Sequence, residues 1–173
     1  MVALGIIGFC GAVAEGAVAD WSGVFMKDRL RAGDGVAPLA YAGFACLMLL
    51  ARLLCDRLKD RYGARRVVAY GALLAAAGIF AAVLAPDQAL AIAGFACAGA
   101  GLAAVFPFVF SAAGRHGAAS LAAVATFSYS GGLFGPPVIG FLAQGWGLGM
   151  AIGFVGLVGI AIAVAAGRAK WLA

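Results

Sequence analysis

A carboxylate within an apolar segment is the first feature of this sequence that could do chemistry. Glu15 lies about midway along the apolar stretch Val2–Met26. An ionised side chain at the centre of a bilayer costs roughly 3 kcal/mol or more, so such residues commonly bind a substrate, an ion or a proton. We predict that Glu15 faces a cavity; the alternative is a structural acid hydrogen-bonded between helices. Asp20, five residues further on, could bind substrate or a proton, or could be an interfacial residue or a helix cap.

Hydroxyls and prolines form a second candidate group. Ser128 and Tyr129 precede Pro136 and Pro137 in an uncharged stretch, and Pro107 lies inside another apolar segment. Proline removes a backbone donor and frees a carbonyl group. In membranes such breaks are tolerated where neighbouring protein or water supplies partners. We expect the prolines to interrupt two helices and the hydroxyls to line a cavity or gate. Helix–helix packing through Ser and Gly is an equally open interpretation.

The charged residues gather in one dense cluster, Ala51–Arg66 (ARLLCDRLKDRYGARR). Arg52 lies four residues before Asp56, a spacing at which an arginine can pair with an acid and keep its charge near the membrane edge. The alternative for Arg52 is a snorkelling side chain.

Composition indicates a membrane protein. The chain of 173 residues is 65% hydrophobic and 11% charged, whereas soluble domains are about half apolar and a quarter charged. The net charge of +5 does not indicate nucleic-acid binding, because most basic residues flank apolar runs. The four cysteines have no C-x-x-C spacing. Without a P-loop, a metal-ligand cluster, a nucleophile elbow or a dinucleotide fingerprint, we predict no enzyme activity, no cofactor and no metal.

Apolar length predicts an all-α protein with six transmembrane helices in a single domain, residues 1–173. A crossing needs about 20 apolar residues. The expected crossings are Val2–Met26, Val36–Cys55, Val67–Ala85, Gln88–Gly114, Leu121–Ala143 and Leu148–Gly167. The last two are separated because the uncharged stretch 117–167 would otherwise make a helix of about 76 Å. We place that break at Gln144–Gly147, and expect Asp34 to cap the second helix with Pro38 in its first turn.

Basic residues are distributed unevenly between the two sides of this arrangement. The richer side has Arg57, Lys59, Arg61, Arg65, Arg66, Arg115, Arg168 and Lys170, and the other has Lys27, Arg29 and Arg31. The positive-inside rule makes the richer side cytoplasmic. We therefore predict a multi-pass protein of the inner membrane with both termini in the cytoplasm and Arg57–Arg66 as a cytoplasmic loop.

The segment DRYGARR resembles the signature loop of the major facilitator superfamily, which joins the second and third helices of each half. The family pattern has a glycine, an acid, a basic residue, a glycine and a basic pair. The corresponding positions are Asp60, Arg61, Gly63, Arg65 and Arg66. Asp56 stands where the family has its first glycine, and Ala64 stands where a basic residue is expected. Such a degraded copy resembles the loop of the second half.

Three further stretches agree with this resemblance. Glu15–Ser22, Phe106–Arg115 and Gly135–Gly140 look like the seventh, tenth and eleventh helices of bacterial permeases near the fucose permeases. The resemblance implies the C-terminal six-helix half of a twelve-helix transporter that works by alternating access. It implies that Glu15, Phe106 and Pro107 face the central cavity. Ser128, Tyr129 and Pro136 would lie on a gating helix, and the loop charges would pair across the cytoplasmic face in one state.

The implied partners are the lipid bilayer, a small solute and a second six-helix half. The resemblance leaves the solute and the coupling ion open, with proton symport as one option. Two alternatives remain: a membrane bundle that does not transport, and a homodimeric half-transporter in which Glu15 occurs twice around one cavity.

Overall fold

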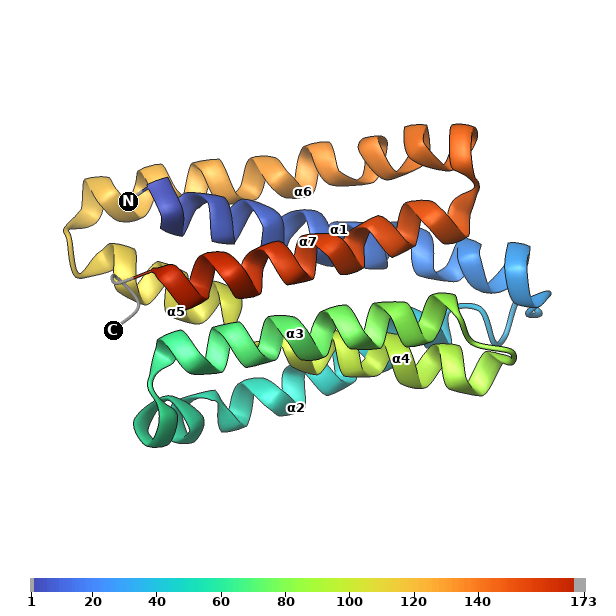
Figure 1. Cartoon of the computed structure of the whole chain (residues 1–173), viewed down its shortest axis with the longest axis horizontal. Coiled ribbons are helices and arrows are strands. Elements are labelled where there is room, and N and C mark those ends of the chain that lie inside the picture. Colours follow the sequence, from blue (N-terminus) through green and yellow to red (C-terminus); the bar gives the residue numbers. More distant parts are fainter. Residues whose placement is uncertain (1, 170–173) are drawn as a thin grey trace.

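In the computed structural model, which describes residues 2–169, the chain forms a bundle of long helices (Figure 1). The helical segments are α1 (Val2–Leu30), α2 (Leu39–Tyr62), α3 (Ala64–Val83), α4 (Gln88–Leu102), α5 (Val105–Gly114), α6 (Ala118–Trp146) and α7 (Leu148–Arg168). α4 and α5 are two parts of one crossing, separated only by Ala103 and Ala104. The expected all-α fold of six crossings is therefore confirmed.

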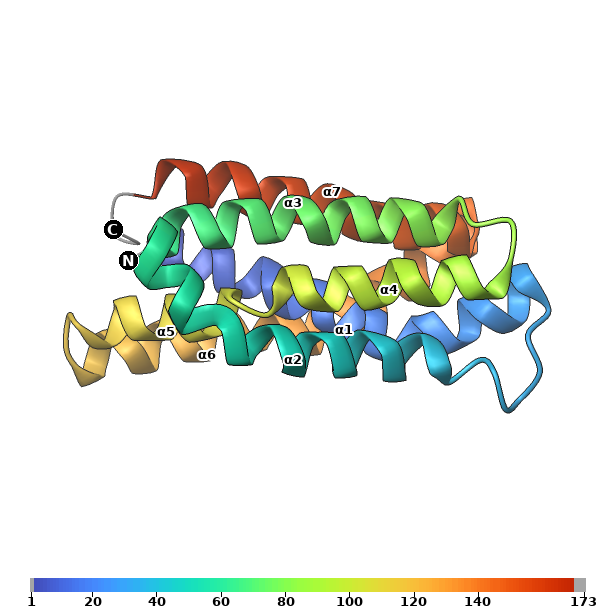
Figure 2. The same cartoon turned by 90° about the horizontal axis from the view of Figure 1, so that it is seen from below.

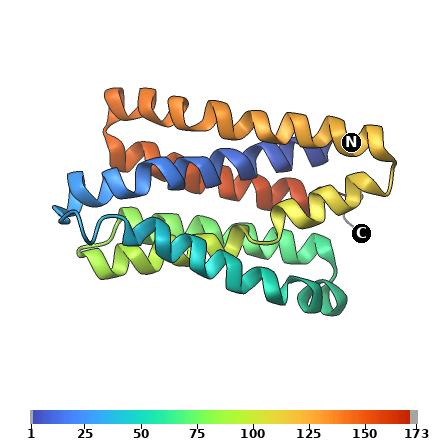
Figure 3. The same cartoon turned by 180° about the vertical axis from the view of Figure 1, so that it is seen from behind.

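Five of the crossings are long and apolar enough to span a membrane by length and composition: α1, α2, α3, the continuous stretch Gln88–Gly114, and α7. α6 has 29 residues, as many as α1. It carries hydroxyls, glycines, a glutamine and two prolines, but no charged side chain. α6 still runs beside α1 along most of its length, as Figures 1 and 3 both show.

The helices have two distinct neighbourhoods. α3 packs against both α4 and α7, and α2 packs on α4 from the other side, as the turned view in Figure 2 shows. The start of α1 and the end of α7 lie at the same end of the bundle (Figure 1). The α2–α3 and α5–α6 connections lie at that end too, as expected for an even number of crossings.

Glycines allow the closest helix contacts. A Cβ atom added at Gly78 of α3 would lie 2.5 Å from the Gly94 carbonyl oxygen and 2.7 Å from the Ala98 nitrogen on α4. One at Gly135 of α6 would lie 2.9 Å from the Val13 Cα atom on α1. Only glycine permits these backbones to approach so closely, which is how membrane helices gain packing energy without a hydrophobic driving force.

The structure corrects two helix boundaries at the polar ends. α1 continues to Leu30 through the first part of the expected loop, and α2 continues to Tyr62 through most of the expected loop Arg57–Arg66. The α2–α3 connection is Gly63 alone, with φ +82°. Arg, Lys and Leu are good helix formers, so the helices extend past the apolar core. The prediction of a loop over Arg57–Arg66 was therefore wrong.

Two smaller expectations at helix ends have different outcomes. Asp34 does not cap α2, which begins after Pro38; its carboxylate instead accepts a hydrogen bond of 2.6 Å from Lys27 Nζ. The break between the last two crossings falls within the expected segment, because α6 ends at Trp146 and Gly147 has φ +82°.

The prolines act in different ways. The fourth crossing breaks at Ala103 and Ala104, and Pro107 lies in the first turn of α5. Pro107 has no N–H to donate to the carbonyl group of Ala103 four residues earlier, which accounts for a break at this position. Pro136 and Pro137 do not interrupt α6, and that prediction was wrong.

Contacts with α1 support the proline segment of α6. Trp21 Nε1 donates a hydrogen bond of 3.0 Å to the Pro136 carbonyl oxygen. Pro136 also leaves the Gly132 carbonyl without its helical donor, and Gly16 lets the α1 backbone approach that oxygen. α6 thus stays continuous through both prolines, with α1 packed closely against this part of the helix.

Candidate functional site

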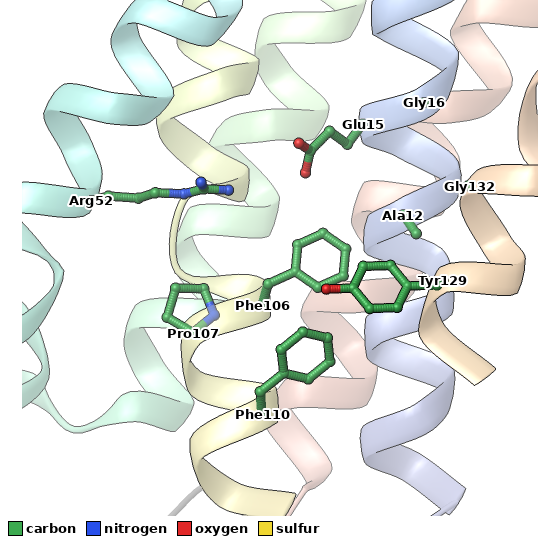
Figure 4. A pocket seen from close by; sticks show the side chains of 9 residues that line it. All are labelled: Ala12, Glu15, Gly16, Arg52, Phe106, Pro107, Phe110, Tyr129 and Gly132. Atoms are coloured by element: carbon green, nitrogen blue, oxygen red, sulfur yellow. The ribbon is translucent and has the colours of Figure 1, made fainter. Parts of the chain in front are cut away.

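A cleft of about 530 Å³ opens on one side of the bundle between α1, α2, α5 and α6. Figure 4 shows its lining, with α3 and α7 behind it. The lining residues are Ala12, Glu15, Gly16, Arg52, Phe106, Pro107, Phe110, Tyr129 and Gly132. Glu15, Arg52, Phe106, Pro107 and Tyr129 are site residues predicted from the sequence, and the fold brings them together from four helices.

Two opposite charges face this cleft. The Glu15 carboxylate and the Arg52 guanidinium extend into it from α1 and α2 (Figure 4). Arg52 lies close enough to act electrostatically on Glu15, yet among the described residues no ion pair within 4.0 Å joins the two. A small molecule can therefore interact with either charge without first breaking a salt bridge.

The expected pair between Arg52 and Asp56 is not formed. The Arg52 guanidinium Nη2 lies 3.2 Å from the Met48 sulfur, one turn towards the start of α2. Within residues 2–169, the one ion pair is that between Lys27 and Asp34. A helical side chain tends to point towards the N-terminus of its helix, which favours Met48 over Asp56 as a neighbour.

Three aromatic rings form the wall beside Glu15. Phe106 and Phe110 have ring centroids 5.5 Å apart, and Tyr129 lies 6.4 Å from Phe106 and 5.9 Å from Phe110. Phe106 and Tyr129 are nearly parallel, at 19°. Such a wall offers flat apolar faces next to two charges. The sequence analysis missed Phe110, although its position four residues after Phe106 on one helix would have placed it on the same face.

Ser128 and Asp20 lie outside the cleft. Ser128 is fully buried where α6 packs on α1, and its hydroxyl donates a 2.7 Å hydrogen bond to the Val124 carbonyl. Consecutive residues point about 100° apart on a helix, and here Tyr129 lines the cleft whereas Ser128 points towards α1. Asp20 is exposed and borders a separate hollow between α1 and α2. Neither residue lines this cleft, and their part in binding a substrate or a proton stays a prediction.

The residues of the signature-like segment lie at the end of the bundle that also holds the start of α1. The exposed residues of this segment include Asp56, Asp60, Arg61, Gly63, Arg65 and Arg66. The Arg61 guanidinium lies 5.3 Å from the ring centroid of Tyr62, and Lys59 Nζ lies 5.6 Å from that of Phe108 on α5. No acid of the described chain pairs with these basic residues.

Comparison with known proteins decides the family. Residues 2–172 match the family model described as Major Facilitator Superfamily. The chain belongs to the major facilitator superfamily. This is a family of multi-pass membrane transporters rather than enzymes. Within residues 2–169, no group of three or more His, Cys, Asp and Glu side chains could hold a metal ion.

Curated members of the superfamily are similar to almost the whole chain. Membrane protein MosC of Rhizobium meliloti is 38% identical over 169 residues, which are 95% of this chain and 42% of MosC. An uncharacterised MFS-type transporter of Yersinia pestis is 36% identical over 167 residues, which are 94% of this chain and 44% of that protein. The chain thus spans less than half the length of the curated relatives it matches.

Solved structures of the superfamily share the fold. The E. coli fucose:proton symporter FucP superposes with a TM-score of 0.83 at 21% sequence identity, over 95% of this chain and 41% of the symporter. A peptide transporter, POT, gives a TM-score of 0.79 at 20% identity, over 95% of this chain and 37% of that protein. At these identities the likeness concerns the arrangement of helices alone.

Proposed function

We propose that this chain is the C-terminal half of a secondary transporter, which moves a small solute across the inner membrane by alternating access. The observation that carries the proposal is the cleft in which Glu15 and Arg52 lie without an ion pair between them. Transporters of this kind bind solute near the bilayer midplane, between two bundles that rock against each other. The position of Glu15 midway along α1 fits such a site.

The cleft has walls on one side only. Its lining comes from four helices of this chain, and α3 and α7 lie behind them (Figure 4). A second six-helix bundle facing α1, α2, α5 and α6 would complete the enclosure. The curated relatives, of which this chain matches 42% and 44%, have enough additional sequence for such a bundle.

Each polar group then has a distinct part. Glu15 accepts a proton or a hydrogen-bond donor of the solute, and Arg52 binds an acceptor or an anionic group. Phe106, Phe110 and Tyr129 pack against the apolar part of the solute. The unpaired charges of Asp60, Arg61, Arg65 and Arg66 pair with the other half in one state and separate in the other, which shifts the equilibrium between the two states. Their side of the membrane is cytoplasmic, as are both termini, by the positive-inside rule.

The test compares two carboxylate-to-amide variants on the same helix. Glu15→Gln and Asp20→Asn are made in the transporter expressed with the coding sequence upstream of Met1, and uptake of a panel of radiolabelled sugars, amino acids and organic acids is measured in inverted and right-side-out vesicles. We expect Glu15→Gln to abolish proton-dependent uptake and Asp20→Asn to retain it, because only Glu15 lines the cleft. Equal uptake by Glu15→Gln and the unmodified protein would favour the alternative of a bundle that does not transport.

A homodimeric half-transporter is the second candidate. One observation favours it: the same face carries Glu15 and Arg52, so two copies related by a two-fold axis could place each charge opposite its complement. In a variant without the four native cysteines, Gly132→Cys introduces a thiol into the cleft, where its Cβ atom would meet only Ala12, at 4.0 Å. Disulfide crosslinking of identical chains through this thiol at low membrane density supports the dimer, and monomers alone would exclude it.

A further inference from the structure

A second hollow lies on a different side of the molecule, between the end of α1, α3, α7 and the α6–α7 connection. Its volume is about 760 Å³. Its walls are mainly apolar and include Phe80 and Leu84 of the α3 side and Phe154 and Leu157 of α7. At its end lie Asp28 and Arg29 of α1, together with Trp146. We call this hollow the α3–α7 groove.

The groove exists because α7 has no side chains where they would fill it. A Cβ atom at Gly153 would have no atom within 4 Å, so the position faces open space. At Gly149 a Cβ atom would meet Arg29 Nε at 3.7 Å, so the guanidinium lies against the backbone of α7. The large side chains that border the groove are exposed, among them Leu84, Met150 and Leu157.

The two charges at the end of the groove have no ion-pair partner within the described chain. Arg29 and Asp28 are both exposed, and neither forms a salt bridge. Asp28 also borders the neighbouring hollow between α1 and α2. Trp146 is a residue type that gathers at the membrane–water interface. An apolar groove in the bilayer thus ends, at interface depth, in one positive and one negative charge.

We propose that the α3–α7 groove binds a phospholipid with a zwitterionic aminoalkyl headgroup, of the phosphatidylethanolamine type. An acyl chain lies along Phe154 and Leu157, over Gly153. Arg29 donates charge-assisted hydrogen bonds to the phosphate, and the ammonium group is placed against Asp28. The positive charge of Arg29 and the negative charge of Asp28 match the phosphate and the ammonium of this headgroup. A purely anionic lipid can satisfy only Arg29.

This site is independent of the transport cycle proposed above. The cleft opens between α1, α2, α5 and α6, whereas the groove lies along α3 and α7, which Figure 4 places behind the cleft. Lipid binding can therefore be measured on the purified chain with no transport assay. The proposed function and the lipid site can fail separately.

The experiment is native mass spectrometry of the purified full chain titrated with lipid in detergent. The probes are dioleoyl phosphatidylethanolamine, dioleoyl phosphatidylglycerol, which has the phosphate without the ammonium, and phosphorylethanolamine, which has no acyl chains. We expect phosphatidylethanolamine to bind most tightly and phosphorylethanolamine not to bind. Equal affinity for the two lipids would overturn the part assigned to Asp28, and binding of phosphorylethanolamine alone would overturn the part assigned to the groove.

Variants separate the headgroup contacts from the apolar contact. Arg29→Gln should weaken the binding of both lipids about tenfold, which is the loss expected for one charge-assisted hydrogen bond. Asp28→Asn should lower the affinity for phosphatidylethanolamine to the affinity for phosphatidylglycerol.

Gly153→Leu fills the groove and should abolish binding. Its matched control is Gly167→Leu, on the same helix and also with no atom within 4 Å of the added Cβ. Unchanged binding in Arg29→Gln or in Gly153→Leu would overturn the proposal. Quenching of tryptophan fluorescence by brominated phosphatidylethanolamine, lost in a Trp146→Phe variant, provides a second measurement.

Discussion

The close α3–α4 crossing gives the sharpest prediction about stability. In Gly78→Ala the new methyl group would lie 2.5 Å from the Gly94 carbonyl oxygen and 2.7 Å from the Ala98 nitrogen. Both are backbone atoms, so no side chain can rotate away. To reach an ordinary contact of 3.4 Å the helices must separate by about 0.9 Å at this point, the difference between 3.4 and 2.5 Å.

Two opposing effects, the cost of the close contact and the gain in helix propensity, set the change in the free energy of unfolding in Gly78→Ala. A gap of 0.5–1 Å removes roughly a quarter to a half of the dispersion energy of the atoms that line it. Overpacking of this kind typically costs roughly 1–3 kcal/mol. Alanine also stabilises a helix by about 0.5–1 kcal/mol relative to glycine. We expect Gly78→Ala to be less stable than the unmodified chain by about 1 kcal/mol.

The matched control is Gly153→Ala, a helix-interior glycine whose added methyl group meets no atom within 4 Å. This variant keeps only the gain in helix propensity, so the two variants should differ by about 2 kcal/mol. The assay is unfolding of the purified chain in mixed micelles with increasing sodium dodecyl sulfate, followed by circular dichroism. If Gly78→Ala unfolds at the same detergent fraction as Gly153→Ala or at a higher one, α3 and α4 do not approach each other this closely at Gly78.

The reciprocal position provides a further check. A methyl group at Gly94 would lie 2.7 Å from the Gly78 carbonyl oxygen and 2.7 Å from the Ala82 nitrogen. Gly94→Ala should therefore destabilise the chain to a similar extent. The double variant should cost less than the sum of the two, because the first substitution already separates the helices that the second one would push apart. Strict additivity would indicate two independent contacts.

Two further predictions concern α1. Trp21→Phe removes the hydrogen bond to the Pro136 carbonyl, so it should lower the free energy of unfolding by about 1 kcal/mol, whereas Trp146→Phe, an exposed position, should leave it unchanged. At the loop, the hydrogen bond and the charge of Lys27 lower the pKa of the Asp34 carboxyl below its ordinary value. The folded pKa is below the unfolded one, so the small contribution of this pair is present above the unfolded pKa and is lost as the pH falls through the folded pKa. An NMR titration of Asp34 in Lys27→Gln should show the ordinary pKa restored, and an unchanged value would exclude Lys27 as the cause.

The number of crossings could be predicted from the sequence, but the face that each helix presents could not. Apolar length alone gives the six crossings, since each needs about 20 apolar residues. α4 has no charged side chain and the polar residues of α1 do not share one face, so no single polar face indicates the orientation of either helix. Ser128 and Tyr129 show the consequence: the sequence offers these adjacent residues as equally good candidates, and packing alone places one in a helix contact and the other in the cleft.

The predictions of where α2 ends and of a break at Pro136 were wrong. The α2 helix continues through Asp60 and Arg61 although the segment is polar, because these residue types tolerate a helix in water. Pro136 stays within a continuous α6, and Trp21, 115 positions away in the sequence, donates a hydrogen bond to its carbonyl group. No local pattern reports that partner. Pro107 has its effect within one turn, where a local pattern can indicate it.

The unformed pair between Arg52 and Asp56 belongs to the same argument and bears on function. Had Arg52 bonded to Asp56 along α2, the cleft would contain a single carboxylate. Instead its guanidinium reaches into the cleft opposite Glu15 without forming an ion pair. Two charges facing lipid would each cost roughly 3 kcal/mol or more, so this face must be covered by protein, by water or by a charged solute. Sites where local rules fail are often functional. At this site the departure leaves a positive and a negative group available to the same small molecule.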